Sequence, residues 1–415
     1  MANNIIIKNI KELVTCSGFK AKKGREMQEL NILKDYSLLI EDGIIKDIKA
    51  SWEELEISKD DYEVIQGEEL SILPGFVDSH THFIFAGYRE EEFYERFKGT
   101  PYMEIMKRGG GIANTVDKTR GAHKETLLQL GRERIKDMIS MGITTVEGKS
   151  GYGLDLSSEL LQLQVMKELQ EEGEIDIAST FLGAHAFPKD FQGTKLDYIK
   201  YIIKEVLPLV RKEDLAEFCD VFCEKNVFEI EESRYLLEAA KAMGFKLKLH
   251  ADEIVSLGGT ELGCELGAVS CDHLLQASDE GIKALASSNT IATLLPCTAF
   301  SLKESYARGR TMIDEGCAVA LATDFNPGSC FTQSIPFLIA LACYNMNLTL
   351  EEAITALTIN GAAALGKENI IGSIDIGKQA DLLILKYPSY KFLLYNVATN
   401  IVDVVIKKGR VVYRR

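Results

Sequence analysis

The chain has 415 residues, of which 46% are hydrophobic and 26% are charged, and its formal net charge is −15. This composition is typical of a soluble globular protein, and the length predicts one barrel-sized domain with a smaller one beside it. An acidic surface disfavours nucleic acid and anionic membranes as partners. With no membrane-span-length apolar stretch and no basic, apolar leader at the N-terminus, the sequence predicts a cytoplasmic protein.

The nine cysteines are scattered along the chain without the spacing of a disulfide framework. Several lie in or beside apolar runs, among them Cys219, Cys271, Cys297 and Cys343. We therefore expect reduced, mostly buried thiols, as in a protein of a reducing compartment.

Both ends of the chain have the pattern of short strands and turns. Near the N-terminus, the acidic-glycine turn at 41–43 separates two short apolar runs and predicts a hairpin. The last fifty residues contain similar apolar runs at 381–385, 402–406 and 411–413. Two β-rich ends around a different middle predict one small β-sandwich domain, built from residues 1–71 and 366–415.

The middle of the chain, residues 72–365, alternates strand-like and helical patterns. Amphipathic segments such as 157–169 and 233–243 separate the apolar runs. Eight such alternations are typical of a parallel (β/α)8 TIM-like barrel, in which chemistry takes place at the carboxyl ends of the strands. The eight predicted strands span 76–80, 143–147, 175–181, 219–223, 245–250, 268–271, 290–295 and 318–323.

Five of the six histidines follow or end these predicted strands, which places them on one face of the barrel. His80 and His82 are two residues apart, so their side chains point to the same side of an extended segment. With His250 and Asp324, they offer three imidazoles and one carboxylate, which suit one zinc or iron ion. The alternative is a polar rim without a metal.

Two further residues are candidates for proton transfer. Glu253, three residues after His250, can reach a substrate nitrogen. His273, at the end of the sixth strand, can orient a nucleophile or polarise a carbonyl oxygen, and Asp324 can accept a proton from water. The alternatives are an exposed loop acid for Glu253 and a hydrogen-bonded core residue for His273.

Several sequence blocks resemble the mononuclear branch of the amidohydrolase superfamily. They are the segment 74–78 before His80, the block 250–253, and the segment 372–382 that leads into the last strands. The resemblance covers nearly the whole chain and implies hydrolysis of a carbon–nitrogen bond in an amide or amidine.

More specific blocks resemble the imidazolonepropionase family, at 85–93, 108–112, 147–154, 183–185 and 324–329. The resemblance implies opening of 4-imidazolone-5-propanoate to N-formimidoyl-L-glutamate in L-histidine degradation, and it implies a homodimer. Lys149 invites comparison with the carbamylated lysine of binuclear relatives. It lies after the second predicted strand, however, which is not the place in the barrel for that role. One metal ion per chain is therefore predicted.

The substrate of that family has a planar ring and a propionate tail, and the residues offer partners for both. Arg89 presents a fork of donors for the carboxylate. Its alternative role is a surface pair with Glu90 or Glu92, and Tyr152 could instead pack a loop. The predicted substrate-binding residues are Arg89, Tyr152, His185, Glu253, Asn326, Gly328 and Ser329.

Two other functions remain open from the sequence. A nucleobase deaminase of the same superfamily would use the same metal ligands, but a nucleobase has no carboxylate for Arg89. A metal-free scaffold barrel would not need the ligand residues, all of which are present.

Overall fold

A closed barrel of parallel strands occupies the middle of the chain in the computed structural model, which describes residues 4–58, 61–100, 104 and 108–415. Eight strands pair in sequence order. The barrel closes where Thr81 bridges Phe325, and where the amide of His82 donates to the carbonyl of Phe325 at 2.9 Å. The barrel strands are β8 (Phe76–Asp78), β9 (Ile143–Lys149), β10 (Asp176–Ala184), β11 (Phe218–Cys223), β12 (Lys246–Ala251), β13 (Ser270–His273), β14 (Ile291–Leu294) and β15 (Val319–Leu321).

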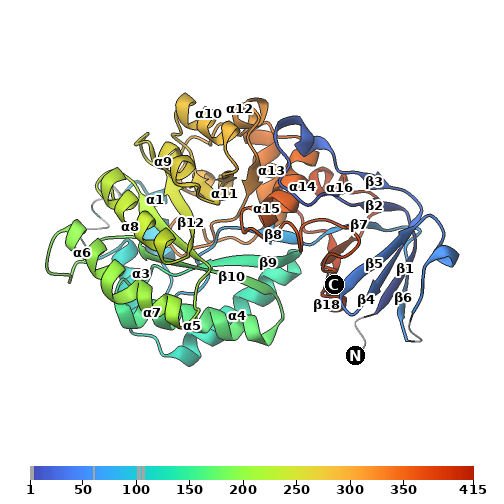
Figure 1. The fold of residues 1–415 in the computed structure, drawn as a ribbon, viewed down its shortest axis with the longest axis horizontal. Helices are drawn as coiled ribbons and strands as arrows, with labels where there is room; N and C mark the ends of the chain where they lie inside the picture. The colour runs from blue at the N-terminus through green and yellow to red at the C-terminus, as the bar shows by residue number, and fades with distance from the viewer. Residues whose placement is uncertain (1–3, 59–60, 101–103, 105–107) are drawn as a thin grey trace.

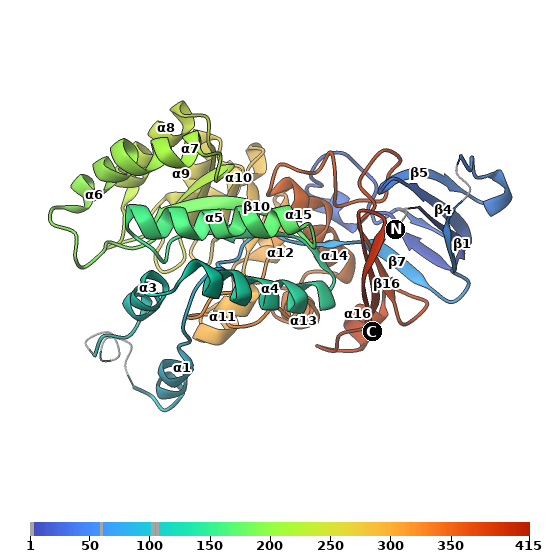
Figure 2. The same ribbon diagram turned by 90° about the horizontal axis from the view of Figure 1, so that it is seen from below.

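Helices cover the outside of the barrel (Figures 1 and 2). The side chain of Asp155 caps the first turn of α5 (Leu156–Glu172), which contains the helix predicted at 157–169. The predicted segment 233–243 lies almost entirely within α8 (Ile230–Ala242). The other helices of the barrel region are α1 (Glu90–Phe97), α3 (Ile112–Arg120), α4 (Lys124–Ser140), α6 (Lys195–Tyr201), the π-helix η3 (Ile202–Val206), α7 (Leu207–Lys212), α9 (Gly259–Leu266), α10 (Asp279–Ser287), α11 (Pro296–Leu302), α12 (Gly309–Asp314), α13 (Ile335–Asn345), α14 (Leu350–Leu357) and α15 (Ile359–Ala363).

Two further sheets lie beside the barrel (Figure 1), one formed by N-terminal strands and one that combines strands from both ends of the chain. The four-stranded sheet has the order β5-β4-β1-β6, and the six-stranded sheet has the order β18-β17-β16-β7-β2-β3. The elements outside the barrel are β1 (Ile5–Ile10), β2 (Glu12–Val14), η1 (Gly24–Gln28), β3 (Ile32–Leu33), β4 (Tyr36–Glu41), β5 (Ile44–Lys49), η2 (Trp52–Glu54), β6 (Glu63–Gln66), β7 (Ser71–Pro74), β16 (Leu382–Leu385), α16 (Phe392–Tyr395), β17 (Val402–Lys407) and β18 (Arg410–Arg414).

Apolar side chains of the two sheets form one separate core. Ile7 and Ile40 from the four-stranded sheet are buried in it with Ile72, Leu382 and Ile406 from the six-stranded sheet. The predicted hairpin is present between β4 and β5, and both turn residues have positive φ, 52° at Asp42 and 78° at Gly43. These observations confirm the predicted fold, a (β/α)8 barrel with a β-sandwich from both termini. The domain boundaries themselves stay a prediction.

The chain passes from the six-stranded sheet into the barrel at Gly75, between β7 and β8. A β-carbon at this position would lie 2.2 Å from Oγ1 of Thr144, so only glycine fits. The two parts are also joined by charge, because Asp176 on β10 accepts hydrogen bonds of 2.7 Å from Lys407 and from Lys408. The barrel is therefore joined to the terminal sheets at the start of β8 and at the start of β10.

All nine cysteines are free thiols, and most of them are buried, as the sequence predicts. Within the described part of the chain, no helix combines the length and the apolar character needed to cross a bilayer.

Candidate metal centre and active site

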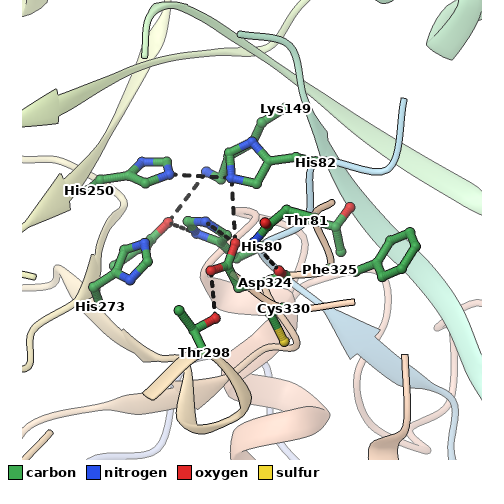
Figure 3. Close-up of polar contacts among 12 residues, drawn as sticks. His80, Thr81, His82, Lys149, His250, His273, Thr298, Asp324, Phe325 and Cys330 are labelled. Atoms are coloured by element: carbon green, nitrogen blue, oxygen red, sulfur yellow. Dashed lines mark hydrogen bonds and ion pairs between the residues drawn. The ribbon is translucent and has the colours of Figure 1, made fainter. Parts of the chain in front are cut away.

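The predicted metal ligands meet at the carboxyl ends of the barrel strands (Figure 3). Nε2 of His80 and Nε2 of His82 each lie 3.6 Å from Oδ1 of Asp324. Nε2 of His250 lies 3.4 Å from Nε2 of His82. These atoms come from segments following β8 and β15 and from β12, and the barrel brings them together across more than 240 residues of sequence.

Two buried carboxylates lie behind the imidazoles and set their orientation. Nδ1 of His80 forms a hydrogen bond of 2.7 Å with Oδ2 of Asp272, and Nδ1 of His250 lies 3.0 Å from Oδ2 of Asp220. Because a carboxylate only accepts, Nδ1 of His80 carries the proton and Nε2 keeps its lone pair. The ring of His80 therefore presents a nitrogen lone pair to the centre, as a metal ligand must.

A buried ionic network fills the barrel interior beneath this centre. The ammonium of Lys149 lies 2.9 Å from Glu147, 2.8 Å from Asp220 and 3.4 Å from Asp272. Lys248 donates to Glu147 at 2.7 Å. Although burial lowers the pKa of Lys149, the carboxylates of Asp220, Glu147 and Asp272 raise it above its ordinary value. Lys149 is therefore a charged structural residue.

Asp324 is held in a defined position on the loop after β15. Its backbone amide donates to the carbonyl of His80 at 3.0 Å, and its Oδ2 accepts from the hydroxyl of Thr298 at 2.6 Å. Its φ of 53° lies in the left-handed region, which is uncommon for a residue with a side chain. These restraints direct the other carboxylate oxygen, Oδ1, at His80 and His82.

The site fits a divalent metal ion. Among the described residues, the buried Nε2 of His80 has no hydrogen-bond partner, which is costly unless another group takes its lone pair. Burial lowers the pKa of His80, His82 and His250 well below the ordinary value, so these imidazoles are neutral and can ligate. Three imidazole nitrogens and a carboxylate oxygen match the preferences of zinc and of iron.

The two predicted proton-transfer residues face each other at the edge of this centre. Nδ1 of His273 lies 3.6 Å from Oε1 of Glu253. Burial raises the pKa of Glu253 to about 8, with a further contribution from the charge of Asp324. Burial lowers the pKa of His273 to about 4. At neutral pH, Glu253 therefore carries a proton while His273 is uncharged.

Aromatic rings form one wall of the site. The ring of His185 stacks on that of His82 with 5.0 Å between the centroids, and Tyr152 lies 5.4 Å from His185 and 5.8 Å from His82. Nδ1 of His185 contacts the carbonyl of Gly151 at 3.0 Å, and burial lowers the pKa of His185 to about 4. The structure thus brings Tyr152 and His185 beside the predicted ligands.

Arg89 contacts the loop that follows Asp324. A β-carbon on Gly328 would lie 2.2 Å from Nη1 of Arg89, so the guanidinium packs directly on this glycine. The side-chain Nδ2 of Asn326 donates to the hydroxyl of Ser329, and its Oδ1 accepts from the backbone amides of Gly328 and Ser329, each at 2.8 Å. Asn326 therefore shapes the loop. Arg89 also pairs with Glu92 at 2.9 Å, the alternative considered from the sequence.

Comparison with known proteins gives close relatives over the full length. The chain is 57% identical over 414 residues to an imidazolonepropionase of Clostridium tetani, covering 99% of both chains. It is 58% identical over 408 residues to one of Parabacteroides distasonis, covering 98% of each. The chain belongs to the imidazolonepropionase family. The resemblance noted in the sequence is thereby confirmed.

Broader comparisons agree with this family. The model described as "Amidohydrolase family" matches residues 227–412. A triazine hydrolase from Arthobacter aurescens has a TM-score of 0.73 at 14% identity, covering 98% of this chain and 94% of the other. A 5-methylcytosine deaminase from Klebsiella pneumoniae has a TM-score of 0.73 at 17% identity, covering 99% and 98%. At these identities, the similarity shows the shared fold alone.

The charged residues beneath the imidazoles were not predicted from the sequence as part of the site. Asp220 and Glu147 lie inside predicted strands, where charged side chains are rare, and Asp272 directly follows one. One signal was available, because Asp272 directly precedes His273, and Glu147 and Lys149 alternate on one strand face. Their mutual pairing depends on closure of the barrel, which no local pattern encodes.

Proposed function

We propose that this chain hydrolyses the ring carbon–nitrogen bond of 4-imidazolone-5-propanoate, giving N-formimidoyl-L-glutamate in L-histidine degradation. Membership of the imidazolonepropionase family supports this reaction. The observation that carries it is the convergence of His80, His82 and Asp324 at one end of the barrel, with Arg89 packed on the adjoining loop. The site offers hydrolytic chemistry beside a cation that can bind a carboxylate.

In this proposal, His80, His82, His250 and Asp324 hold one zinc or iron ion per chain. When bound, such an ion polarises a carbonyl oxygen and lowers the pKa of water from ~15.7 toward ~7. The pairing of Lys149 with three carboxylates supports a single ion, because a charged ammonium cannot become a carbamate that bridges a second one.

The chain's own residues then move the protons. Asp324 or His273 accepts the proton of the attacking water, and His273 stabilises the negative charge that develops on the carbonyl oxygen. Glu253, protonated at neutral pH, donates to the ring nitrogen that leaves. The lactam carbon–nitrogen bond breaks, and the products are a carboxylate and a formimidoyl nitrogen on one molecule.

Substrate recognition follows from the wall and the loop of the site. Arg89 binds the propionate carboxylate, while Tyr152 and His185 hold the planar ring. Glu253 contacts the ring nitrogen. Asn326, Gly328 and Ser329 form the loop beside Asp324 that borders the substrate. A homodimer and a cytoplasmic location are further proposals, supported by the family resemblance.

The experiment is a product assay on purified, metal-quantified protein. Freshly generated 4-imidazolone-5-propanoate should be converted to N-formimidoyl-L-glutamate, whereas a panel of purines and pyrimidines should stay unchanged. Release of ammonia from a nucleobase, without opening of the imidazolone, would replace the proposal with the deaminase reaction. A protein that binds no metal and turns over neither substrate would favour the scaffold alternative.

A further inference from the structure

One carboxylate on α1, that of Glu92, accepts three hydrogen bonds, one from the residue that precedes α1 and two from the start of α3. Its Oε2 accepts from Nε of Arg89 and from the backbone amide of Gly111, each at 2.9 Å. Its Oε1 accepts from the side-chain amide of Asn114 at 2.9 Å. Although partial burial raises the pKa of Glu92, the bonds from Asn114 and Gly111 and the charge of Arg89 lower it overall. Glu92 is therefore ionised at neutral pH.

The hydrogen bond between Arg89 and Glu92 leaves the two Nη groups of Arg89 available for another partner. Glu92 bonds only Nε of the guanidinium, so the two Nη groups keep their donors. Nη1 lies against Gly328, where a β-carbon would come within 2.2 Å. Burial and the charge of Asp324 raise the pKa of Tyr152, whose ring lies beside that of His82, and the charge of Arg89 opposes this rise. The guanidinium is thus fixed between α1 and the loop at the edge of the metal centre.

We propose that Glu92 is a positioning residue for carboxylate recognition: it holds the guanidinium of Arg89 so that its Nη edge binds the propionate tail of the substrate. This inference rests on the proposed function, which supplies the carboxylate. An arginine at this position without its partner would have many rotamers, and the cost of ordering it would reduce the affinity for the tail.

The test measures equilibrium binding, so it does not depend on turnover. Two stable probes are titrated calorimetrically into the metal-loaded protein: 3-(imidazol-4-yl)propionate, which carries the tail, and 4-ethylimidazole, which lacks the carboxylate. The ratio of their affinities reports the contribution of the carboxylate alone. The wild-type protein should prefer the propionate probe, and the variant Glu92→Gln should lower this preference about tenfold, with little change for 4-ethylimidazole.

Two matched variants distinguish the positioning of Arg89 by Glu92 from a general contribution of Glu92 to the stability of α1. Glu91→Gln removes the same charge from an exposed neighbour on α1. Asn114→Ala removes a different contact of the same carboxylate, one of the two that join α1 to the start of α3. Both should keep the wild-type affinity ratio. If Glu92→Gln fails to fold, Glu92→Asp withdraws the carboxylate by about 1.5 Å and carries the same expectation.

The possible outcomes are distinguishable. A wild-type preference for the propionate probe that persists in the Glu92 variant would overturn the positioning role and leave the proposed function intact. An equal loss in Asn114→Ala would also overturn it, because the effect would then come from the packing of the helices. Absence of any preference in the wild-type protein would contradict both the proposed substrate and the role of Glu92.

Discussion

The charge state of individual residues determines what this site can do. Burial keeps the imidazoles of His80, His82 and His250 neutral, and it keeps a proton on Glu253. Burial thus leaves the histidine nitrogens free to bind a cation and keeps Glu253 able to protonate the leaving nitrogen. Arg89 and Glu253 were both predicted from the sequence, whereas the partner that fixes Arg89, Glu92, entered only as a competing surface pair.

Replacement of the acid should affect the chemical step. Glu253→Gln preserves size but removes the proton donor, so kcat should fall by about 10²- to 10⁴-fold with little change in KM. Steady-state kinetics with 4-imidazolone-5-propanoate measures this. Glu304→Gln, a change at an exposed carboxylate near Glu253, should leave kcat within about twofold of the wild type. Full turnover by Glu253→Gln would remove Glu253 from the mechanism.

The pH dependence should reflect the raised pKa of the same residue. Glu253 is active as the protonated acid, so kcat should fall as the pH rises through about 8. The Glu253→Gln variant has no carboxyl group that can titrate at position 253, so its residual kcat should lack the alkaline decrease. An alkaline decrease at the same pH in both proteins would assign the titration to another group.

At the level of elements, strand ends explain how much of the site was predictable. Barrel strands are buried on both faces and give continuous apolar runs, so all eight were recognised from the sequence. Residues that follow such runs must gather at one end of a parallel barrel, which predicted the positions of His185, His273 and Asp324. The pairing of Asp272 with His80 could not be predicted, because it joins residues 192 positions apart.

Because Asp272 pairs with His80, a change at Asp272 should alter the affinity of the site for metal. Asp272→Asn removes the anionic acceptor behind His80, so the affinity for zinc should fall by about 10- to 100-fold, as for other residues that orient a ligand. Competition with a chromophoric chelator measures the affinity independently of activity. The exposed Asp279, on α10, provides the control, and Asp279→Asn should bind zinc as the wild type does. Equal affinities for all three proteins would refute the orienting role.

In the whole molecule, the barrel and the two terminal sheets are joined by buried charge as well as by apolar packing. Asp176 accepts from Lys407 and Lys408 at 2.7 Å, and Lys407 is almost fully buried. These lysines and the desolvation of the carboxylate act in opposite directions, and the lysines lower the pKa of Asp176 below its ordinary value. Sequence pattern predicted that both termini share one sandwich, but not this connection.

Removal of the carboxylate of Asp176, which pairs with Lys407, should destabilise the protein. Asp176→Asn leaves Lys407 buried with Asp381 as its remaining anionic partner at 2.7 Å, so the free energy of unfolding should fall by about 1–3 kcal/mol. Urea denaturation at pH 7 measures it, with the exposed Asp190→Asn as a control that changes less than about 0.5 kcal/mol.

The same variant has an expected pH signature. A carboxyl whose folded-state pKa is lowered stabilises the protein above its ordinary pKa, and this contribution is lost as the pH falls. The stability difference between the wild type and Asp176→Asn should therefore shrink below about pH 4. A difference that stays constant into acid would mean that the charge of Asp176 is not what stabilises the connection.

The central claim is that one metal ion at His80, His82, His250 and Asp324 supports ring opening of the imidazolone. The most direct test is titration of the metal-free protein with zinc or ferrous iron, while the formation of N-formimidoyl-L-glutamate and the bound metal per chain are measured together. Activity should be absent without metal and should saturate at one ion per chain. Full activity of the metal-free protein, or saturation only at two ions per chain, would contradict the account.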